Sequence, residues 1–258
     1  MSSFFAVWFI LGAAVGSFLN VCIYRLPRGE SVIFPPSACP QCRARLKPWD
    51  LVPIFSYLLL RGKCRYCGGK ISSRYPLVET ISGLAFALIW GVSGGDWINL
   101  FFQLLFTSVL IVIFFIDYEH QVIPDAVSVP GIFAGLIYNF LRAPFPNPFI
   151  SALLGMLLGY VLLYGIAAAG KEIFKKEAMG EGDLYLAALL GAFLGWSGVL
   201  LSLFLGCLLA GLVLLVLLPL GKVKMGQYVP FGPALAAGGM ITLFLGERII
   251  NWYLGVFL

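Results

Sequence analysis

Met179-Gly180-Glu181-Gly182-Asp183 joins two long apolar runs of the sequence. An aspartate that opens an apolar segment is costly, because a carboxylate beside hydrocarbon must be solvated, paired or neutralised. The glycines before it let the backbone come close to a partner. Asp183 is therefore a candidate site residue, although a carboxylate at the start of a helix can also serve as a simple N-cap.

The composition around this stretch is that of an integral membrane protein. The 258 residues are 60% hydrophobic and 11% charged, and the mean hydropathy is +0.96. Soluble domains run near a quarter charged. Apolar windows long enough to cross a bilayer recur along the chain, without the alternation typical of a transmembrane barrel. We predict an all-α polytopic membrane protein of about eight transmembrane helices, at 3–23, 76–93, 98–116, 126–141, 149–169, 183–198, 199–218 and 231–254, with a break at Gly195-Trp196-Ser197-Gly198.

Basic residues concentrate in one hydrophilic stretch. Residues 24–75 hold ten of the 17 Lys and Arg, against Glu30 and Asp50. With eight spans, 15 of the 17 Lys and Arg residues lie on one side of the membrane. Only Arg142 and Arg248 do not belong to that group. The positive-inside rule then places residues 24–75 in the cytoplasm and both termini outside. Topology accounts for the basic charge better than a nucleic-acid partner, which we do not predict.

These features divide the chain into three parts. Residues 1–23 are predicted as the first transmembrane helix, 24–75 as a cytoplasmic zinc-binding module, and 76–258 as the transmembrane catalytic domain. Six prolines make the module loop-rich, and it is too small to build much of a core without a staple.

Four cysteines can provide that staple. Cys39 and Cys42 form one C-x2-C pair, and Cys64 and Cys67 form a second after a gap of 21 residues. Two such turns supply the tetrahedral set of four sulfurs that a structural metal requires, and zinc is the ion this set favours. Disulfides are the main alternative, but cytoplasmic thiols stay reduced. A thioredoxin-like redox pair lacks the surrounding βαβ pattern.

A partner for Asp183 follows the third predicted span. Asp117 comes directly after that apolar run, and alternation places it on the same membrane face as Asp183. Two carboxyls at one depth can share a proton and activate a water between them, one acting as base and the other as acid. Asp125 follows Pro124 and is a good N-cap for the fourth span. Plain interface residues, or a cation or proton path through a transporter or membrane scaffold, remain alternatives.

The order of motifs resembles the type IV prepilin peptidase family, bifunctional leader peptidases and N-methyltransferases of pilus and type II secretion systems. The resemblance covers nearly the whole chain and places it in the G-x-G-D class of intramembrane aspartyl proteases. The motifs that carry it are Gly16 to Val21, Arg25-Leu26-Pro27, the two C-x2-C pairs, Ile71 to Glu79, Asp117 to Asp125, Gly180-Glu181-Gly182-Asp183 and Val229-Pro230-Phe231-Gly232-Pro233.

The resemblance implies an activity and a site. Asp117 and Asp183 match the catalytic pair, with Gly180, Gly182 and Asp125 as the supporting active-site loops. Gly62 matches a glycine that the family links to methylation, and we expect Glu79 to be linked to methylation as well. The implied substrate is a prepilin or pseudopilin whose short basic leader is cut after a glycine, in the bacterial inner membrane. The new N-terminus is then methylated with S-adenosylmethionine, although the sequence lacks a dinucleotide-binding fingerprint.

Overall fold

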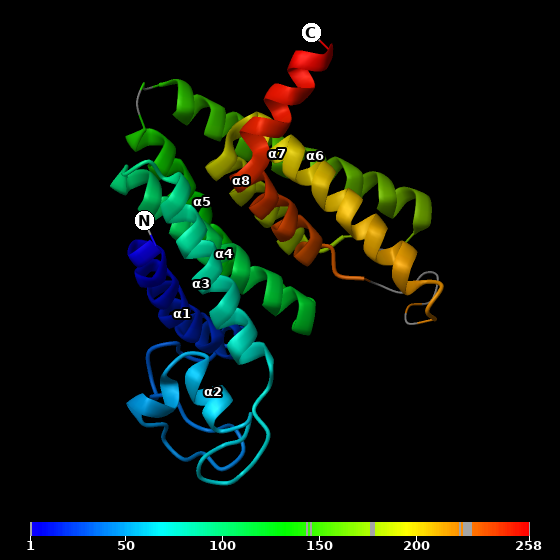
Figure 1. The fold of residues 1–258 in the computed structure, drawn as a ribbon. Coiled ribbons are helices and arrows are strands. Elements are labelled where there is room, and N and C mark those ends of the chain that lie inside the picture. The colour runs from blue at the N-terminus through cyan, green and yellow to red at the C-terminus, as the bar shows by residue number, and fades with distance from the viewer. Residues whose placement is uncertain are drawn as a thin grey trace. The chain divides into compact units, whose positions relative to one another are not determined.

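The computed structural model describes residues 2–257 apart from 143, 145, 176–178, 222 and 224–228. The described residues form helices joined by loops, with isolated β-bridges but no strand. The predicted all-α class is confirmed. In chain order (Figure 1), the elements are α1 (Ser2–Arg25), η1 (Leu26–Arg28), η2 (Pro48–Leu51), α2 (Phe55–Leu59), α3 (Arg74–Val92), α4 (Trp97–His120), α5 (Asp125–Leu141), α6 (Asn147–Phe174), α7 (Glu181–Leu217) and α8 (Gly232–Phe257).

Most of the described helices suit a bilayer. Six of them, α1, α3, α4, α6, α7 and α8, are long and apolar enough to cross a membrane, and α5 is a shorter apolar helix. The chain forms two compact units, residues 1–112 and 113–258, with the boundary inside α4. The predicted division at 23/24 and 75/76 stays a prediction.

In the first unit, α1 and α3 pack side by side (Figure 1). Their approach depends on a glycine, since a methyl group on Gly16 would lie 2.8 Å from Glu79 Cα. The fully buried Asn20 donates from Nδ2 to the carbonyl oxygens of Gly16 and Tyr75, at 3.2 and 3.1 Å. The end of α1 is thereby fixed to the start of α3, and the residues between the two helices gather at that end of the pair.

In the second unit, α7 is a helical hairpin. Gly195 interrupts it with φ 73° and ψ −177°, a conformation open to almost no residue but glycine. A methyl group on Gly159 of α6 would meet both the Ala187 carbonyl, at 2.6 Å, and the Val199 side chain, at 3.0 Å. Twelve residues of straight helix would separate these two by about 18 Å. The chain therefore reverses at Gly195, within the predicted break, and residues 181–194 and 196–217 are antiparallel.

A buried amide stabilises this reversal. The break removes the N–H groups that would bond to the carbonyls of Ala192 and Phe193. Asn139 of α5 replaces them, donating from Nδ2 to these two oxygens at 2.9 and 3.2 Å. Counted with α5 and with both halves of α7, the described residues hold eight apolar helical segments, although six helices are long and apolar enough to cross a membrane.

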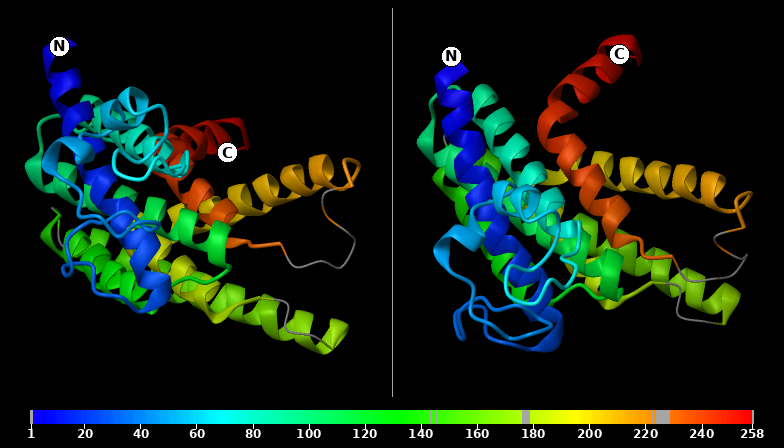
Figure 2. Two further views of the ribbon diagram at one scale, coloured as in Figure 1. Left: turned by 90° about the horizontal axis from the view of Figure 1, so that it is seen from below. Right: turned by 60° about the horizontal axis from the view of Figure 1, so that its bottom comes forward.

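The last helix packs on the second half of α7, and Figure 2 shows α8 (orange to red) beside α7 (yellow) in both views. Small residues form the contact, since a methyl group on Gly238 would lie 2.6 Å from the Ser202 carbonyl oxygen. The buried hydroxyls of Ser202 and Thr242 are 3.0 Å apart and bond across the interface. Close packing of this kind is typical of membrane helices, and it fixes the first residues of α8.

Candidate active site

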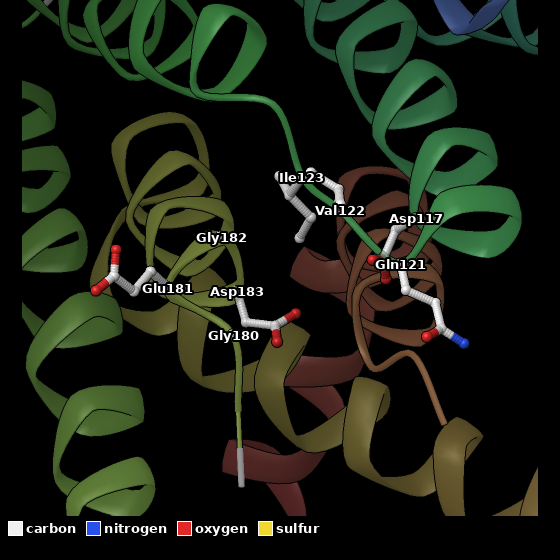
Figure 3. Close-up of a pocket in the computed structure, with 8 residues that line it drawn as sticks. All are labelled: Asp117, Gln121, Val122, Ile123, Gly180, Glu181, Gly182 and Asp183. Carbon is white, nitrogen blue, oxygen red and sulfur yellow. The ribbon is translucent and has the colours of Figure 1, made fainter. Parts of the chain in front are cut away.

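A cavity of about 200 Å³ opens between the last turn of α4 and the start of α7, both in the second unit. Residues 180–183 line one side, and Asp117, Gln121, Val122 and Ile123 line the other. Figure 3 shows the carboxyl groups of Asp117 and Asp183 turned toward the space between these two walls. The structure thus brings the two predicted aspartates to one cavity.

Asp117 belongs to a helix and not to a loop. The sequence predicts a span that stops at 116, but α4 continues to His120, and the next residue, Gln121, has a φ of 55°. The Asp117 side chain is only 4% exposed. Its Oδ2 has no hydrogen-bond partner among the described residues. Buried polar atoms are nearly always paired, so an unpaired carboxylate oxygen facing a cavity suits a group that meets substrate.

Gly232, the first residue of α8, lies directly against this carboxyl. A methyl group on Gly232 would stand 2.5 Å from Asp117 Oδ2 and 3.0 Å from Ile123 Cδ1. Only a residue without a side chain leaves Asp117 in this position. The sequence places Gly232 in a family motif without giving it a role, and the close approach assigns one.

Asp183 lies in the first turn of α7, but it is not the cap. The N-cap position belongs to Gly180, which has no side chain to cap the free N–H groups there. The Asp183 backbone N–H donates to the Gly180 carbonyl at 3.2 Å, while the side chain is 4% exposed and lines the same cavity as Asp117. A carboxylate in the first turn suits the helix dipole, and this one also lines the cavity that it shares with Asp117.

The two glycines before Asp183 have different surroundings. A methyl group on Gly182 would lie 2.7 Å from Ile123 Cβ, so this glycine lets α7 pack against the segment that follows α4. A methyl group on Gly180 would have only Asp183 Oδ2 nearby, at 3.8 Å. Gly180 therefore leaves open space beside the carboxylate, whereas Gly182 is needed for packing.

The structure does not bring Asp125 to the cavity. It is the exposed first residue of α5, and Pro124 occupies the N-cap position predicted for Asp125. A carboxylate in the first turn still suits the helix dipole. Gln121 lines the cavity instead, although nothing in its local sequence pattern marks it as a site residue.

The four cysteines form a compact cluster in the first unit. Their Sγ atoms all lie within 4.8 Å of one another, and those of Cys39 and Cys67 are 3.9 Å apart. Zinc–sulfur bonds of about 2.3 Å in a tetrahedron place sulfurs about 3.8 Å apart. The donor set and its spacing therefore fit a zinc ion.

Each cysteine pair builds the same turn. The backbone N–H of Arg43 donates to the Cys39 carbonyl at 2.8 Å, and that of Gly68 donates to the Cys64 carbonyl at 2.9 Å. Arg43 and Gly68 each follow the second cysteine of a pair, and their φ values are 57° and 68°. Two copies of one turn thus face each other across the sulfurs.

The electrostatics of the cluster suit a bound cation. Burial opposes ionisation of Cys39, but the N–H groups of Cys42 and Gln41 and two neighbouring thiols outweigh it and lower the pKa of Cys39 to about 7. Despite the N–H of Gly69, burial and the other thiols raise the pKa of Cys67 to about 11. One thiolate forms readily and further ones do not, so four thiolates at this spacing would need the opposing charge of a bound metal.

Gly62 and Glu79 both hold the short helix α2. Glu79 Oε2 accepts the Ile54 backbone N–H at 2.7 Å. The Gly62 N–H donates to the Tyr57 carbonyl at 2.9 Å, and a methyl group on Gly62 would meet the Tyr57 hydroxyl at 3.0 Å. The two residues fix a loop, and their link to methylation stays a prediction.

Comparisons with known proteins cover both units. The "Bacterial Peptidase A24 N-terminal domain" matches residues 10–92, and the "Type IV leader peptidase family" matches residues 104–215. The three similar curated proteins described next are each named prepilin leader peptidase/N-methyltransferase. That of Neisseria gonorrhoeae is 41% identical over 95% of this chain and 93% of its own length. Those of Pseudomonas putida and Aeromonas hydrophila are 37% and 35% identical, over 93% and 99% of this chain and 90% and 95% of their own lengths. No solved structure matches the chain.

Proposed function

Because the chain belongs to the type IV leader peptidase family, we propose that Asp117 and Asp183 are the catalytic pair of an intramembrane aspartyl endopeptidase. The observation that carries this assignment is their shared cavity, into which two nearly buried carboxyls point. The family and the names of its members support a peptidase with methyltransferase activity, and not the transporter or scaffold alternative.

The pair works by exchanging protons with one water and one peptide bond. The ionised carboxyl takes a proton from the water, whose oxygen attacks the carbonyl carbon of the scissile bond. The protonated carboxyl donates a hydrogen bond to the carbonyl oxygen and then passes its proton to the nitrogen as the C–N bond breaks. The products are a leader that ends in a carboxylate and a new N-terminal amine.

The position of the pair suits a substrate that is itself a membrane helix. Asp117 lies in the last turn of α4 and Asp183 in the first turn of α7, so both are near helix ends and not at the bilayer centre. We propose that a prepilin or pseudopilin places its scissile bond here, where its basic leader leaves the membrane. The charge distribution supports an inner-membrane location with residues 24–75 in the cytoplasm.

Incubation with a prepilin tests both activities. With the purified enzyme alone, the intact mass of the substrate should fall by the mass of the leader. With S-adenosylmethionine added, the mature product should gain one methyl group. An unchanged substrate mass in both reactions would contradict the proposed peptidase.

We propose S-adenosylmethionine as the methyl donor, the molecule that would supply the methyl group to the new amine. Glu79 Oε2 is already bonded to Ile54, and Gly62 faces the Tyr57 ring. Both residues would therefore act on methylation through the position of α2, and not by holding the donor.

We propose that Cys39, Cys42, Cys64 and Cys67 hold a structural zinc ion. Purified protein should contain about one zinc per chain, and Cys64→Ser should lose it, because three sulfurs leave the ion open to water and chelators. Residues 24–75 should then become sensitive to proteolysis, since zinc binding and folding are coupled in small modules. Cys207→Ser, on α7, is the matched control. A Cys64→Ser variant that kept its metal would contradict the site.

A further inference from the structure

The helix α2 presents an apolar face outside the spanning helices. Phe55, Leu58 and Leu59 are 67, 63 and 82% exposed. Their spacing of three and four residues places them on one side of the helix. Large apolar side chains gathered on one exposed face indicate an interaction surface, and the peptidase site does not use this one.

A strained turn holds α2 at a fixed place. Ile54, just before the helix, has φ 63° and ψ −52°, and the Phe55 N–H donates to the Pro53 carbonyl at 2.6 Å. This is a γ-turn of the rare, strained form, and positive φ is unusual for a β-branched residue. The buried Glu79 carboxylate stabilises the turn by accepting the Ile54 N–H.

Glu79 also sets the depth of α2. The 19 residues of α3 span about 28 Å, which is no more than the thickness of the hydrocarbon. Glu79 is the sixth of these residues, about 7.5 Å along the axis from the first. Its side chain leans toward the start of the helix. The Ile54 amide, 2.7 Å from Glu79 Oε2, therefore lies beside the first turns of α3.

The charges beside α2 match a lipid surface. Arg61 and Lys63 follow the helix directly, and both are exposed. Basic side chains next to an apolar helix face are typical of segments that rest on anionic lipid.

We propose that α2 is an interfacial anchor, with Phe55, Leu58 and Leu59 inserted among the lipids of the leaflet that faces residues 24–75. Arg61 and Lys63 contact the anionic headgroups of that leaflet. Glu79 of α3 accepts the N–H of Ile54, directly before α2, and so holds α2 beside α3. The lipid contact of α2 therefore continues that of α3. The zinc module is therefore held against the bilayer at a second point besides its two chain ends.

Photocrosslinking of the full-length protein tests this placement. The photoreactive residue p-benzoylphenylalanine replaces Leu59 or, as a matched control, the exposed Arg45 of the first cysteine turn. The protein is reconstituted in vesicles of phosphatidylethanolamine and phosphatidylglycerol with a prepilin peptide present, irradiated and analysed by mass spectrometry. Adducts to lipid are expected at position 59 and not at position 45.

Two further variants separate the parts of the proposal. Glu79→Ala should reduce the lipid adduct at position 59, because the turn loses its acceptor. Arg61→Gln should reduce the share of phosphatidylglycerol in that adduct. Adducts at position 59 to the peptide or to a second copy of the chain, in place of lipid, would overturn the anchor and assign the face to that partner. The absence of any adduct at position 59 would also overturn it. None of these outcomes depends on peptidase activity.

Discussion

Leader cleavage should fall at least about 10³-fold when Asp183 is replaced by asparagine, and by a similar factor for Asp117→Asn. Asparagine has nearly the same size, so the cavity keeps its shape, but an amide neither takes a proton from water nor donates an acidic one. Each carboxyl needs the other, and the double variant should therefore cleave no more slowly than either single one. Initial rates on a prepilin, measured by intact mass, give the comparison.

The control for this pair is Asp96→Asn, which makes the same chemical change outside the cavity. Asp96 Oδ1 accepts the N–H groups of Ile98 and Asn99 at the start of α4, and asparagine caps a helix about as well as aspartate. Asp96→Asn should therefore cleave at the rate of the unmodified enzyme. Substantial cleavage by a folded, membrane-inserted Asp117→Asn or Asp183→Asn protein would rule out the catalytic pair.

Much of this site follows from topology read along the sequence. Alternating spans, with sides assigned from the basic residues, predict that Asp117 and Asp183 lie on one membrane face at one depth. The structure brings both residues to the same cavity. The cysteine spacing likewise predicts a cluster that the structure contains. Such predictions succeed because hydrophobic length and thiol spacing are local properties of the chain.

Contacts between distant segments are what the sequence does not reveal. No local pattern shows that Asn139 bonds to the carbonyls freed at Gly195, or that Glu79 accepts the Ile54 N–H. The two glycines before Asp183 predict a close approach to a partner without naming it. At Gly182 the partner is Ile123, whose Cβ would lie 2.7 Å from an added methyl group. Tertiary packing decides such roles, and the spacing of residues along the sequence does not show which distant segments pack together.

Gly232 offers the second large effect. Gly232→Ala should reduce cleavage by about 10²-fold, because the added methyl group and Asp117 Oδ2 cannot stay 2.5 Å apart. Either the carboxyl turns away from Asp183 or the start of α8 moves. Both changes misplace a catalytic group by a few tenths of an ångström or more, and proton transfer depends steeply on such positions.

Gly255→Ala separates this local effect from a general one. It makes the same change on the same helix, where a methyl group meets nothing within 4 Å, so its cleavage rate should not fall. Thermal unfolding in detergent should be similar for both variants, because the Gly232 contact lies at the first residue of α8 and leaves the contact between Gly238 and Ser202 intact. A Gly232→Ala enzyme with an unchanged rate would show that Asp117 can move freely, and the close contact would then not define the working position of its carboxyl. A slower enzyme of normal stability would instead show that α8 sets that position.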